Sequence, residues 1–98
     1  MDSRLADRFG RNLQRCRRRA GLSQQELADL IELGRVDVST LERGLRLPRL
    51  DTILKVSAGA GVSPCELLNG FRWFPGHYVE GSFSVEEPGS DWAKRGEP

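Results

Sequence analysis

Apolar side chains recur every three or four positions through the first twenty residues, and this spacing predicts an amphipathic helix over residues 3–19. The apolar stripe consists of Leu5, Phe9, Leu13, Cys16 and Ala20. The opposite face carries arginine at the same spacing, at Arg4, Arg8, Arg11, Arg15 and Arg18, with Arg17 and Arg19 beside them. We expect the first three of these arginines to lie on a solvated face.

A second helix has a sharply defined start at Ser23. Glu26 follows three positions later, so each side chain can accept a hydrogen bond from the other residue's backbone N–H, which is a capping box. Leu22 and Leu27 can form the hydrophobic staple that accompanies such a box. The helix then continues with apolar residues at Leu27, Leu30 and Ile31, next to the small Ala28.

A third helix is predicted over residues 35–43, after a short break at 32–34. Val38 and Leu41 keep the helical spacing of apolar residues, and Gly44 suits the left-handed conformation that often ends a helix. The chain therefore contains two short helices joined by a tight turn.

A fourth helix is predicted over residues 49–58, directly after Pro48. Its buried side is expected to hold Leu50, Ile53, Leu54 and Val56. Glycines at positions 59 and 61 should give this helix a loose end.

A fifth helix should begin at Ser63, because Pro64 then occupies the first helical position, where proline is favoured. Glu66 stands three positions after Ser63, as Glu26 does after Ser23, and would complete a second capping box. Leu67 and Leu68 would close the core.

The composition changes after residue 70. Six of the seven aromatic residues follow, at Phe71, Trp73, Phe74, Tyr78, Phe83 and Trp92. Residues 78–79 and 82–85 predict two short extended pieces that could pair as a hairpin, and residues from about 86 onward predict a frayed end. We therefore divide the chain into a helical domain, residues 1–70, and an aromatic C-terminal extension, residues 71–98.

Three groups of residues carry a resemblance to a known family. They are Gly21-Leu22-Ser23-Gln24 with Glu26-Leu27-Ala28, the apolar set Ile31, Leu33, Val38 and Leu41, and Glu42-Arg43-Gly44 before Pro48. Over residues 5–70 the chain resembles the Cro and phage-repressor type (XRE-like) helix-turn-helix transcriptional regulators, whose register places Glu42 19 positions after Ser23. The resemblance implies an all-α fold, a five-helix lambda-repressor-like DNA-binding domain, followed here by a short C-terminal extension that is irregular or a small β-hairpin.

In this family the third helix enters the major groove with its first residues against base edges. Carried over by position, the residues that would contact bases are Arg35, Val36, Asp37, Thr40 and Gln24. The residues that would contact phosphates are Ser23, Ser39, Arg43, Arg46, Arg18 and Arg19. Arg35 is the best candidate, because its guanidinium can donate two hydrogen bonds to guanine. Alternatively, Arg35 contacts a phosphate and no base. The arginines of residues 15–19 either lie near DNA phosphates or belong to a solvated face.

Two further positions on this surface have alternative interpretations. Val36 either meets a thymine methyl group or packs on the preceding helix. Asp37 would be repelled by phosphates unless it accepts a hydrogen bond from cytosine, pairs with Arg35 or serves the helix N-terminus. We interpret Glu42 as structural, an acid that orients an arginine or backbone groups inside the domain.

The chain departs from the family pattern at three positions. Glu32 replaces a turn glycine, Gly34 replaces a serine or threonine cap, and Gly59 interrupts the fourth helix. The first two departures put in doubt the angle of the third helix, and with it which side chains reach bases.

Charge and composition exclude several classes of function. Residues 1–50 carry 11 arginines and 7 acids, a net charge of +4, whereas residues 51–98 have a net charge of −3, so any basic surface is local. Neither an apolar run of about 18 residues nor a signal-peptide pattern occurs, so we expect a cytoplasmic protein without membrane contact. Cys16 and Cys65 are expected to be buried, reduced thiols. The single histidine, His77, has no cysteine or acid near it at the spacing of a catalytic or metal-binding motif. We therefore predict neither catalysis nor a metal or other cofactor.

One reading helix covers only a few base pairs, so the resemblance implies a homodimer on a palindromic operator in double-stranded DNA. The residues expected to contact the second copy or another protein are Trp73, Phe74, Tyr78 and Phe83, which could instead cover the domain's own core. The competing function is a protein-interaction module, such as an antitoxin or adaptor, that binds its partner through residues 71–85. The acidic, aromatic extension and Asp37 on the reading face favour that alternative.

Overall fold

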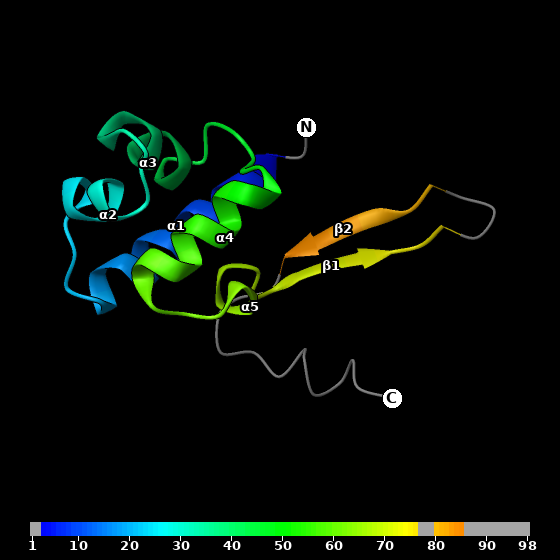
Figure 1. Cartoon of the computed structure of the whole chain (residues 1–98). Coiled ribbons are helices and arrows are strands. Elements are labelled where there is room, and N and C mark those ends of the chain that lie inside the picture. The colour runs from blue at the N-terminus through cyan, green and yellow to red at the C-terminus, as the bar shows by residue number, and fades with distance from the viewer. Residues whose placement is uncertain (1–2, 77–79, 86–98) are drawn as a thin grey trace. The chain divides into compact units, whose positions relative to one another are not determined.

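A computed structural model describes residues 3–76 and 80–85 of the chain. The chain forms two compact units, Met1–Leu68, here the helical unit, and Asn69–Pro98, here the hairpin unit. The described elements are α1 (Ser3–Arg19), α2 (Gln24–Leu30), α3 (Arg35–Glu42), α4 (Leu50–Ala60), α5 (Pro64–Leu67), β1 (Phe71–Phe74) and β2 (Ser82–Val85). The expected five helices and small hairpin are confirmed (Figure 1).

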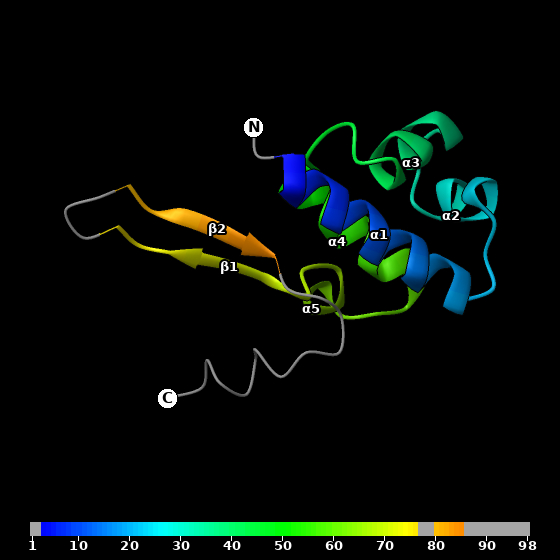
Figure 2. The same cartoon turned by 180° about the vertical axis from the view of Figure 1, so that it is seen from behind.

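The helical unit is built around α1. In Figure 1 α4 lies in front of α1, and in the reverse view of Figure 2 α1 lies in front of α4. Helices α2 and α3 lie at the left in Figure 1 and at the right in Figure 2. The predicted apolar stripe is buried in the core apart from Ala20, which is exposed. Arg8 is also buried, so the expectation that it lies on a solvated face is wrong, whereas Arg4 and Arg11 are exposed.

The family pattern has a glycine in the left-handed conformation at the turn between α2 and α3, and this chain has Glu32 at that position. Glu32 has φ of 58°, and no other non-glycine residue among those described has a positive φ. Such a conformation costs an ordinary residue about 1–2 kcal/mol. The chain therefore keeps the turn geometry with an unfavourable residue. Leu30, expected on the apolar side of α2, is instead exposed.

The exposed and buried faces of α4 differ from the sequence prediction. Its core contacts come from Val56, Ser57 and Ala60. Leu50 and Leu54 are 74% and 52% exposed, so their predicted burial is wrong. The sequence allowed this error because apolar residues occur on more than one face of the helix.

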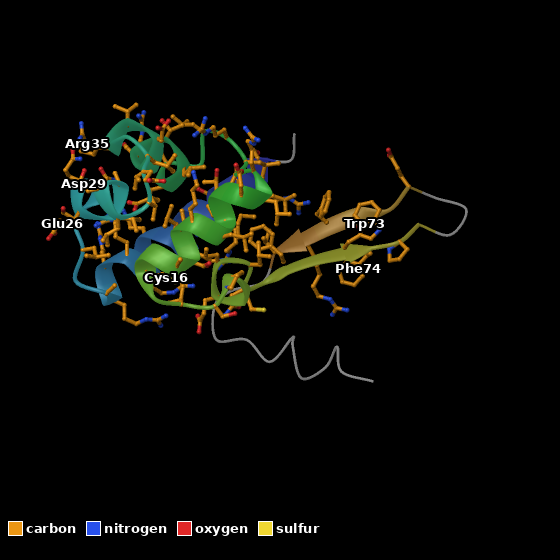
Figure 3. The ribbon with its side chains drawn as sticks, viewed as in Figure 1. Cys16, Glu26, Asp29, Arg35, Trp73 and Phe74 are labelled. Carbon is orange, nitrogen blue, oxygen red and sulfur yellow. The ribbon has the colours of Figure 1, made fainter. Side chains whose placement is uncertain are left out.

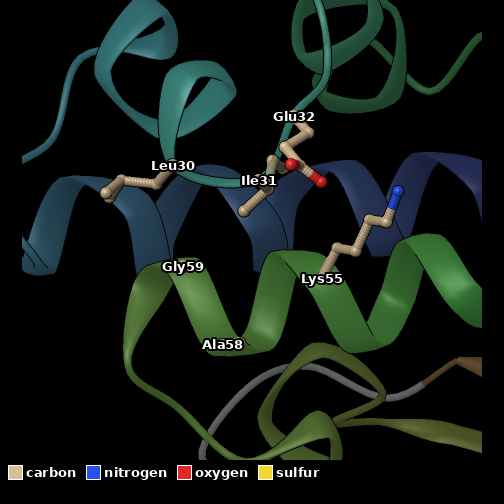
Figure 4. Close-up of a pocket in the computed structure, with 6 residues that line it drawn as sticks. All are labelled: Leu30, Ile31, Glu32, Lys55, Ala58 and Gly59. Atoms are coloured by element: carbon tan, nitrogen blue, oxygen red, sulfur yellow. The ribbon is translucent and has the colours of Figure 1, made fainter.

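Gly59 does not interrupt α4, which continues to Ala60. A Cβ atom at Gly59 would lie 2.5 Å from Ile31 Cγ2 and 2.9 Å from Leu27 Cδ1, so the glycine lets α2 approach α4 closely. Beside this contact lies a cavity of about 390 Å³, across which the side chains of Glu32 and Lys55 point toward one another (Figure 4). The cavity is lined by Leu30, Ile31, Glu32, Lys55, Ala58 and Gly59.

The short helix α5 begins at Ser63 as predicted, but without a second capping box. The Ser63 hydroxyl accepts a hydrogen bond from the N–H of Cys65, at 3.2 Å. The carboxylate of Glu66 lies instead 3.6 Å from the guanidinium of Arg19 on α1. Leu67 is buried as expected, and Leu68 is exposed.

The hairpin unit pairs β1 antiparallel to β2, with Trp73 opposite Phe83. The second strand matches the prediction for residues 82–85, whereas the first lies at 71–74 and residues 78–79 are outside the described residues. The rings of Trp73 and Phe83 have centroids 4.8 Å apart. Because alternate residues face the same side of a strand, Phe71, Trp73, Phe83 and Val85 share one apolar face.

Candidate nucleic-acid interface

The first turn of α3 projects from the helical unit. Arg35 and Val36 are both exposed, and Val36 has 68% of its surface accessible, so the alternative that Val36 packs on the preceding helix is wrong. Figure 3 shows Arg35 at the outer edge of the α2–α3 pair, on the same side as Glu26 and Asp29 of α2. Further along α3, Val38 and Leu41 are fully buried and anchor the helix to the core.

Asp37 compensates for the missing cap of α3. Gly34 occupies the N-cap position with extended backbone, and its N–H donates to the Asp37 carboxylate at 3.1 Å. The other Asp37 oxygen lies 3.5 Å from the guanidinium of Arg46. Asp37 therefore serves the helix N-terminus, one of the expected roles, and its ionic partner is Arg46 rather than Arg35.

A buried ionic network joins the three helices of the motif. Arg17 of α1 donates from Nε to Glu42 Oε2 at 2.5 Å and from Nη2 to Glu42 Oε1 at 2.9 Å. A third hydrogen bond runs from Arg17 Nη1 to the carbonyl of Leu22 at 2.8 Å. The Arg17 and Glu42 side chains are 9% and 2% exposed, and their hydrogen bonds raise the pKa of Arg17. The network fixes α1, the start of α2 and the end of α3 to one another.

Gln24 belongs to the same network. Its Nε2 donates to Glu42 Oε1 at 3.1 Å, so one carboxylate holds both Arg17 and Gln24. The structural role expected for Glu42 is confirmed. The sequence interpretation missed Arg17 and grouped it with the cationic face. Its position four residues after the core residue Leu13 was a signal that this arginine lies beside the apolar stripe.

The predicted phosphate contacts fall into groups with different surroundings. The Ser23 hydroxyl accepts from the Glu26 N–H at 3.0 Å, and the Ser23 N–H donates to Glu26 at 2.9 Å, which confirms the first capping box. Ser39 and Thr40 are half-buried on α3, and Arg43 is exposed just after it. Arg18 is exposed near the end of α1, and Arg19 is directed to Glu66 of α5.

The remaining candidate residues lie away from α3. Cys16 is buried and desolvation raises the pKa of its thiol, whereas Cys65 is exposed, so the predicted burial holds for Cys16 and is wrong for Cys65. Among residues 3–76 and 80–85, no three acidic, histidine or cysteine side chains are grouped as a metal site, and His77 is outside this part. In the same part of the chain, no helix is both long and apolar enough to cross a membrane.

Three of the four aromatic residues expected to contact a partner are exposed on the hairpin unit, with Trp73 and Phe83 on one face and Phe74 on the opposite face. Trp73, Phe74 and Phe83 are all exposed, and the Arg72 guanidinium lies 4.9 Å from the centroid of the Phe74 ring. Tyr78 lies outside the described residues.

Comparison with known proteins gives consistent matches over the helical unit. The chain is 40% identical over 62 residues to the SPbeta prophage-derived uncharacterized HTH-type transcriptional regulator YonR of Bacillus subtilis (strain 168), covering 63% of this chain and 57% of YonR. It is 39% identical over 62 residues to the control protein C.BamHI of Bacillus amyloliquefaciens, covering 62% of this chain and 76% of C.BamHI. The chain thus spans little more than half the length of YonR.

A solved structure shows the same fold. The restriction-modification controller protein C.AhdI from Aeromonas hydrophila is 40% identical, with a TM-score of 0.61 over 63% of this chain and 94% of that one. A family model described as a helix-turn-helix domain matches residues 8–69. Because that match covers more than half of the chain, and the relatives agree with it, the chain belongs to the helix-turn-helix domain family, as its resemblance to the Cro and phage-repressor type predicted.

Proposed function

We propose that this protein is a sequence-specific DNA-binding transcriptional regulator that binds a palindromic operator as a homodimer through α3. The observation that carries the proposal is that α3 is fixed to the core at its end while its first turn remains exposed. The buried pair of Arg17 and Glu42 fixes α3 against α1 and α2, while Arg35 and Val36 remain exposed at its outer end. A reading helix needs this combination, because base discrimination depends on side chains held in a fixed register.

Arg35 is the principal base contact in this proposal. Its planar guanidinium suits bidentate donation to guanine O6 and N7, and Val36 can contact a thymine methyl group one position on. Gln24, held by Glu42, is oriented rather than free, so it can contribute a contact with little loss of side-chain entropy. Thr40 lies a turn further along α3. Asp37 already caps the helix, and this explains a carboxylate on the reading face without a base contact.

Phosphate contacts should position the domain without choosing sequence. Arg43 and Arg46 flank the exit from α3, and Ser23 and Ser39 lie near the starts of α2 and the middle of α3. Arg18 and Arg19 would contact the backbone only if it approaches the end of α1. The logarithm of the binding constant falls linearly with the logarithm of the salt concentration, and each phosphate contact should make this slope steeper by about 0.9.

The test is selection of bound fragments from random DNA, comparing the native chain with Arg35→Ala and with Arg11→Ala. Arg11 is a matched control, because it is an exposed arginine of α1 paired with Asp7 at 3.1 Å. We expect a palindromic site for the native chain. Arg35→Ala should relax one base position in each half-site and weaken binding by about 1–3 kcal/mol, while Arg11→Ala leaves the preferred sequence unchanged. Failure to enrich any sequence, with binding controlled by salt alone, would refute sequence-specific regulation.

A second candidate function is a protein-interaction module, and the exposed aromatic surface of the hairpin unit favours it. The rings of Trp73 and Phe83 contact each other at a tilt of 60° on the apolar face of a hairpin, and exposed aromatic residues are frequent anchors in protein interfaces. The test is the pair of substitutions Trp73→Ser and Phe83→Ser. Loss of a co-purifying partner with DNA binding intact would support this function, and unchanged behaviour would exclude it.

A further inference from the structure

The cavity between α4 and the turn that joins α2 to α3 has the size and the mixed lining of a small-molecule site. Its volume of about 390 Å³ lies at the lower end of the range of about 300–1,000 Å³ that is usual for such sites. The lining is apolar at Leu30, Ile31 and Ala58, and it carries opposite charges at Glu32 and Lys55. The cavity therefore suits a small ligand with both an apolar and a polar part.

Glu32 occupies a position where a glycine would be easier to accommodate. Its φ of 58° is unfavourable for a residue with a side chain. Its carboxylate forms neither a hydrogen bond nor an ion pair with any residue that the structure describes, so nothing in that part of the chain compensates for the strain. Strained residues persist mainly at functional sites. The Glu32 carboxylate is therefore suited to a positive group from outside the chain, in the cavity that it lines.

Lys55 supplies the opposite charge from the other side of the cavity. It is exposed on α4, and Figure 4 shows its side chain and that of Glu32 extending toward one another without meeting. A ligand with only a negative charge would be repelled by Glu32, and one with only a positive charge would be repelled by Lys55. A neutral apolar ligand would displace water from both charges and give them no partner. A ligand that carries both an ammonium and a carboxylate group satisfies both side chains.

We propose that this cavity binds a free α-amino acid with an apolar side chain. The ammonium group of the ligand donates to the Glu32 carboxylate, and its carboxylate accepts from the Lys55 ammonium. An α-amino acid carries both groups on one carbon atom, which suits two protein side chains that converge on one space. The apolar side chain of the ligand lies against Leu30, whose surface is 61% exposed in the empty cavity and would be covered.

The site adjoins the segment that leads into α3. The turn is held by a hydrogen bond from the Leu33 N–H to the Ala28 carbonyl at 3.1 Å, and α3 begins at Arg35. An amino acid that bridges Glu32 and Lys55 ties this turn to α4 and preorganises the start of α3. The binding site itself needs no DNA and goes beyond the proposed function, whereas an effect of the ligand on DNA affinity rests on that function.

The first test is calorimetric titration of the full chain, without DNA, with L-leucine. We expect saturable binding of one molecule per chain. Isocaproic acid, which lacks the ammonium group, and isoamylamine, which lacks the carboxylate, should each bind at least about tenfold more weakly, because each loses a hydrogen bond between charged groups. Affinity for either analogue equal to that for L-leucine would refute the recognition of both charges. Absence of saturable binding by L-leucine, L-isoleucine, L-methionine and L-phenylalanine would overturn the proposal.

Charge-removing variants locate the binding on the protein. Glu32→Gln and Lys55→Gln nearly keep the size of the side chain, and each should weaken L-leucine binding at least about tenfold. The matched control is Asp7→Asn on α1, an exposed acid 3.1 Å from Arg11, which should keep the native affinity. Circular dichroism checks that each variant is folded. Native affinity in folded Glu32→Gln or Lys55→Gln would overturn the proposal.

The last test separates the site from the proposed function. If α3 reads DNA, saturating L-leucine should raise the affinity of the native chain for its selected DNA about fivefold or more and leave that of Glu32→Gln unchanged. Unchanged or lower DNA affinity would refute this role of the ligand, while the binding site is judged by the calorimetry. A chain that binds L-leucine but enriches no DNA sequence would support the site and refute the regulator proposal. A chain that selects DNA but binds none of the amino acids would do the reverse.

Discussion

Glu42→Gln should destabilise the domain far more than loss of an ordinary ion pair. The Glu42 side chain is 2% exposed and that of Arg17 is 9% exposed, so water cannot replace the lost charge interaction. Removal of one partner from a buried pair costs about 3–5 kcal/mol, because the remaining charge is left uncompensated. A glutamine keeps one acceptor oxygen, so we expect a loss near the lower limit, about 3 kcal/mol.

The assay is urea unfolding followed by circular dichroism. With a slope of about 1–3 kcal/mol per molar for a small domain, a loss of about 3 kcal/mol lowers the midpoint by about 1–3 M. The matched control is Asp7→Asn, which breaks an ion pair with Arg11 whose side chains are 55% and 62% exposed. That change should cost less than about 1 kcal/mol. Similar losses for Glu42→Gln and Asp7→Asn would refute the assignment of a buried network.

A double replacement separates the energy of the pair from its role in positioning. Arg17→Met with Glu42→Leu removes both charges together, and such exchanges are often neutral or stabilising. We expect most of the lost stability to return. Gln24 would then lack the carboxylate oxygen that lies 3.1 Å from its Nε2, so DNA sequence preference should broaden in a fully folded protein. Native preference in this variant would show that Glu42 does not position Gln24.

Three further changes test other parts of the structure. Glu32→Gly should raise the unfolding free energy by about 1 kcal/mol in urea unfolding, since glycine adopts the positive φ at this turn without the steric cost, and no gain would contradict the strain. Gly59→Ala should lower it by about 1–3 kcal/mol in the same assay, because the added Cβ would lie 2.5 Å from Ile31 Cγ2; an unchanged midpoint would refute the close contact. A thiol reagent at neutral pH should label Cys65 at once and Cys16 only after unfolding, because burial raises the pKa of Cys16 and keeps it protonated; Cys65→Ser should abolish the fast phase.

Sequence patterns predicted the elements whose signals are local. The apolar stripe predicted the bounds of α1, and the pair of Ser23 and Glu26 predicted the start of α2, because capping involves residues three positions apart. Gly44 ends the third helix with φ of 71°, as expected for a left-handed residue. These features depend on neighbours along the chain and need no knowledge of tertiary structure.

The failures concern contacts between distant segments. Arg17 was assigned to a cationic surface because its partner Glu42 lies 25 positions away, and only packing of α1 against α3 brings the two together. Leu50 and Leu54 were assigned to the core because helical spacing identifies an apolar face without saying whether the same chain covers it. The strand at residues 71–74 was not predicted for a similar reason, since its pairing with residues 82–85 depends on residues eight or more positions away, and the predicted piece at 78–79 lies outside the described residues.

The division of α3 into an anchored side and an exposed side allows the residues proposed to contact bases to change without loss of stability. Val38 and Leu41 are fully buried and Glu42 is tied to α1, whereas Val36 is 68% exposed. Exchanges at exposed positions away from such anchors usually change stability by less than about 0.5 kcal/mol. Val36→Thr should therefore change the preferred operator base with no shift in the urea midpoint. Val38→Thr, which places a hydroxyl in the core, should instead lower the urea midpoint. If Val36→Thr alters stability and leaves the selected sequence unchanged, position 36 packs rather than reads.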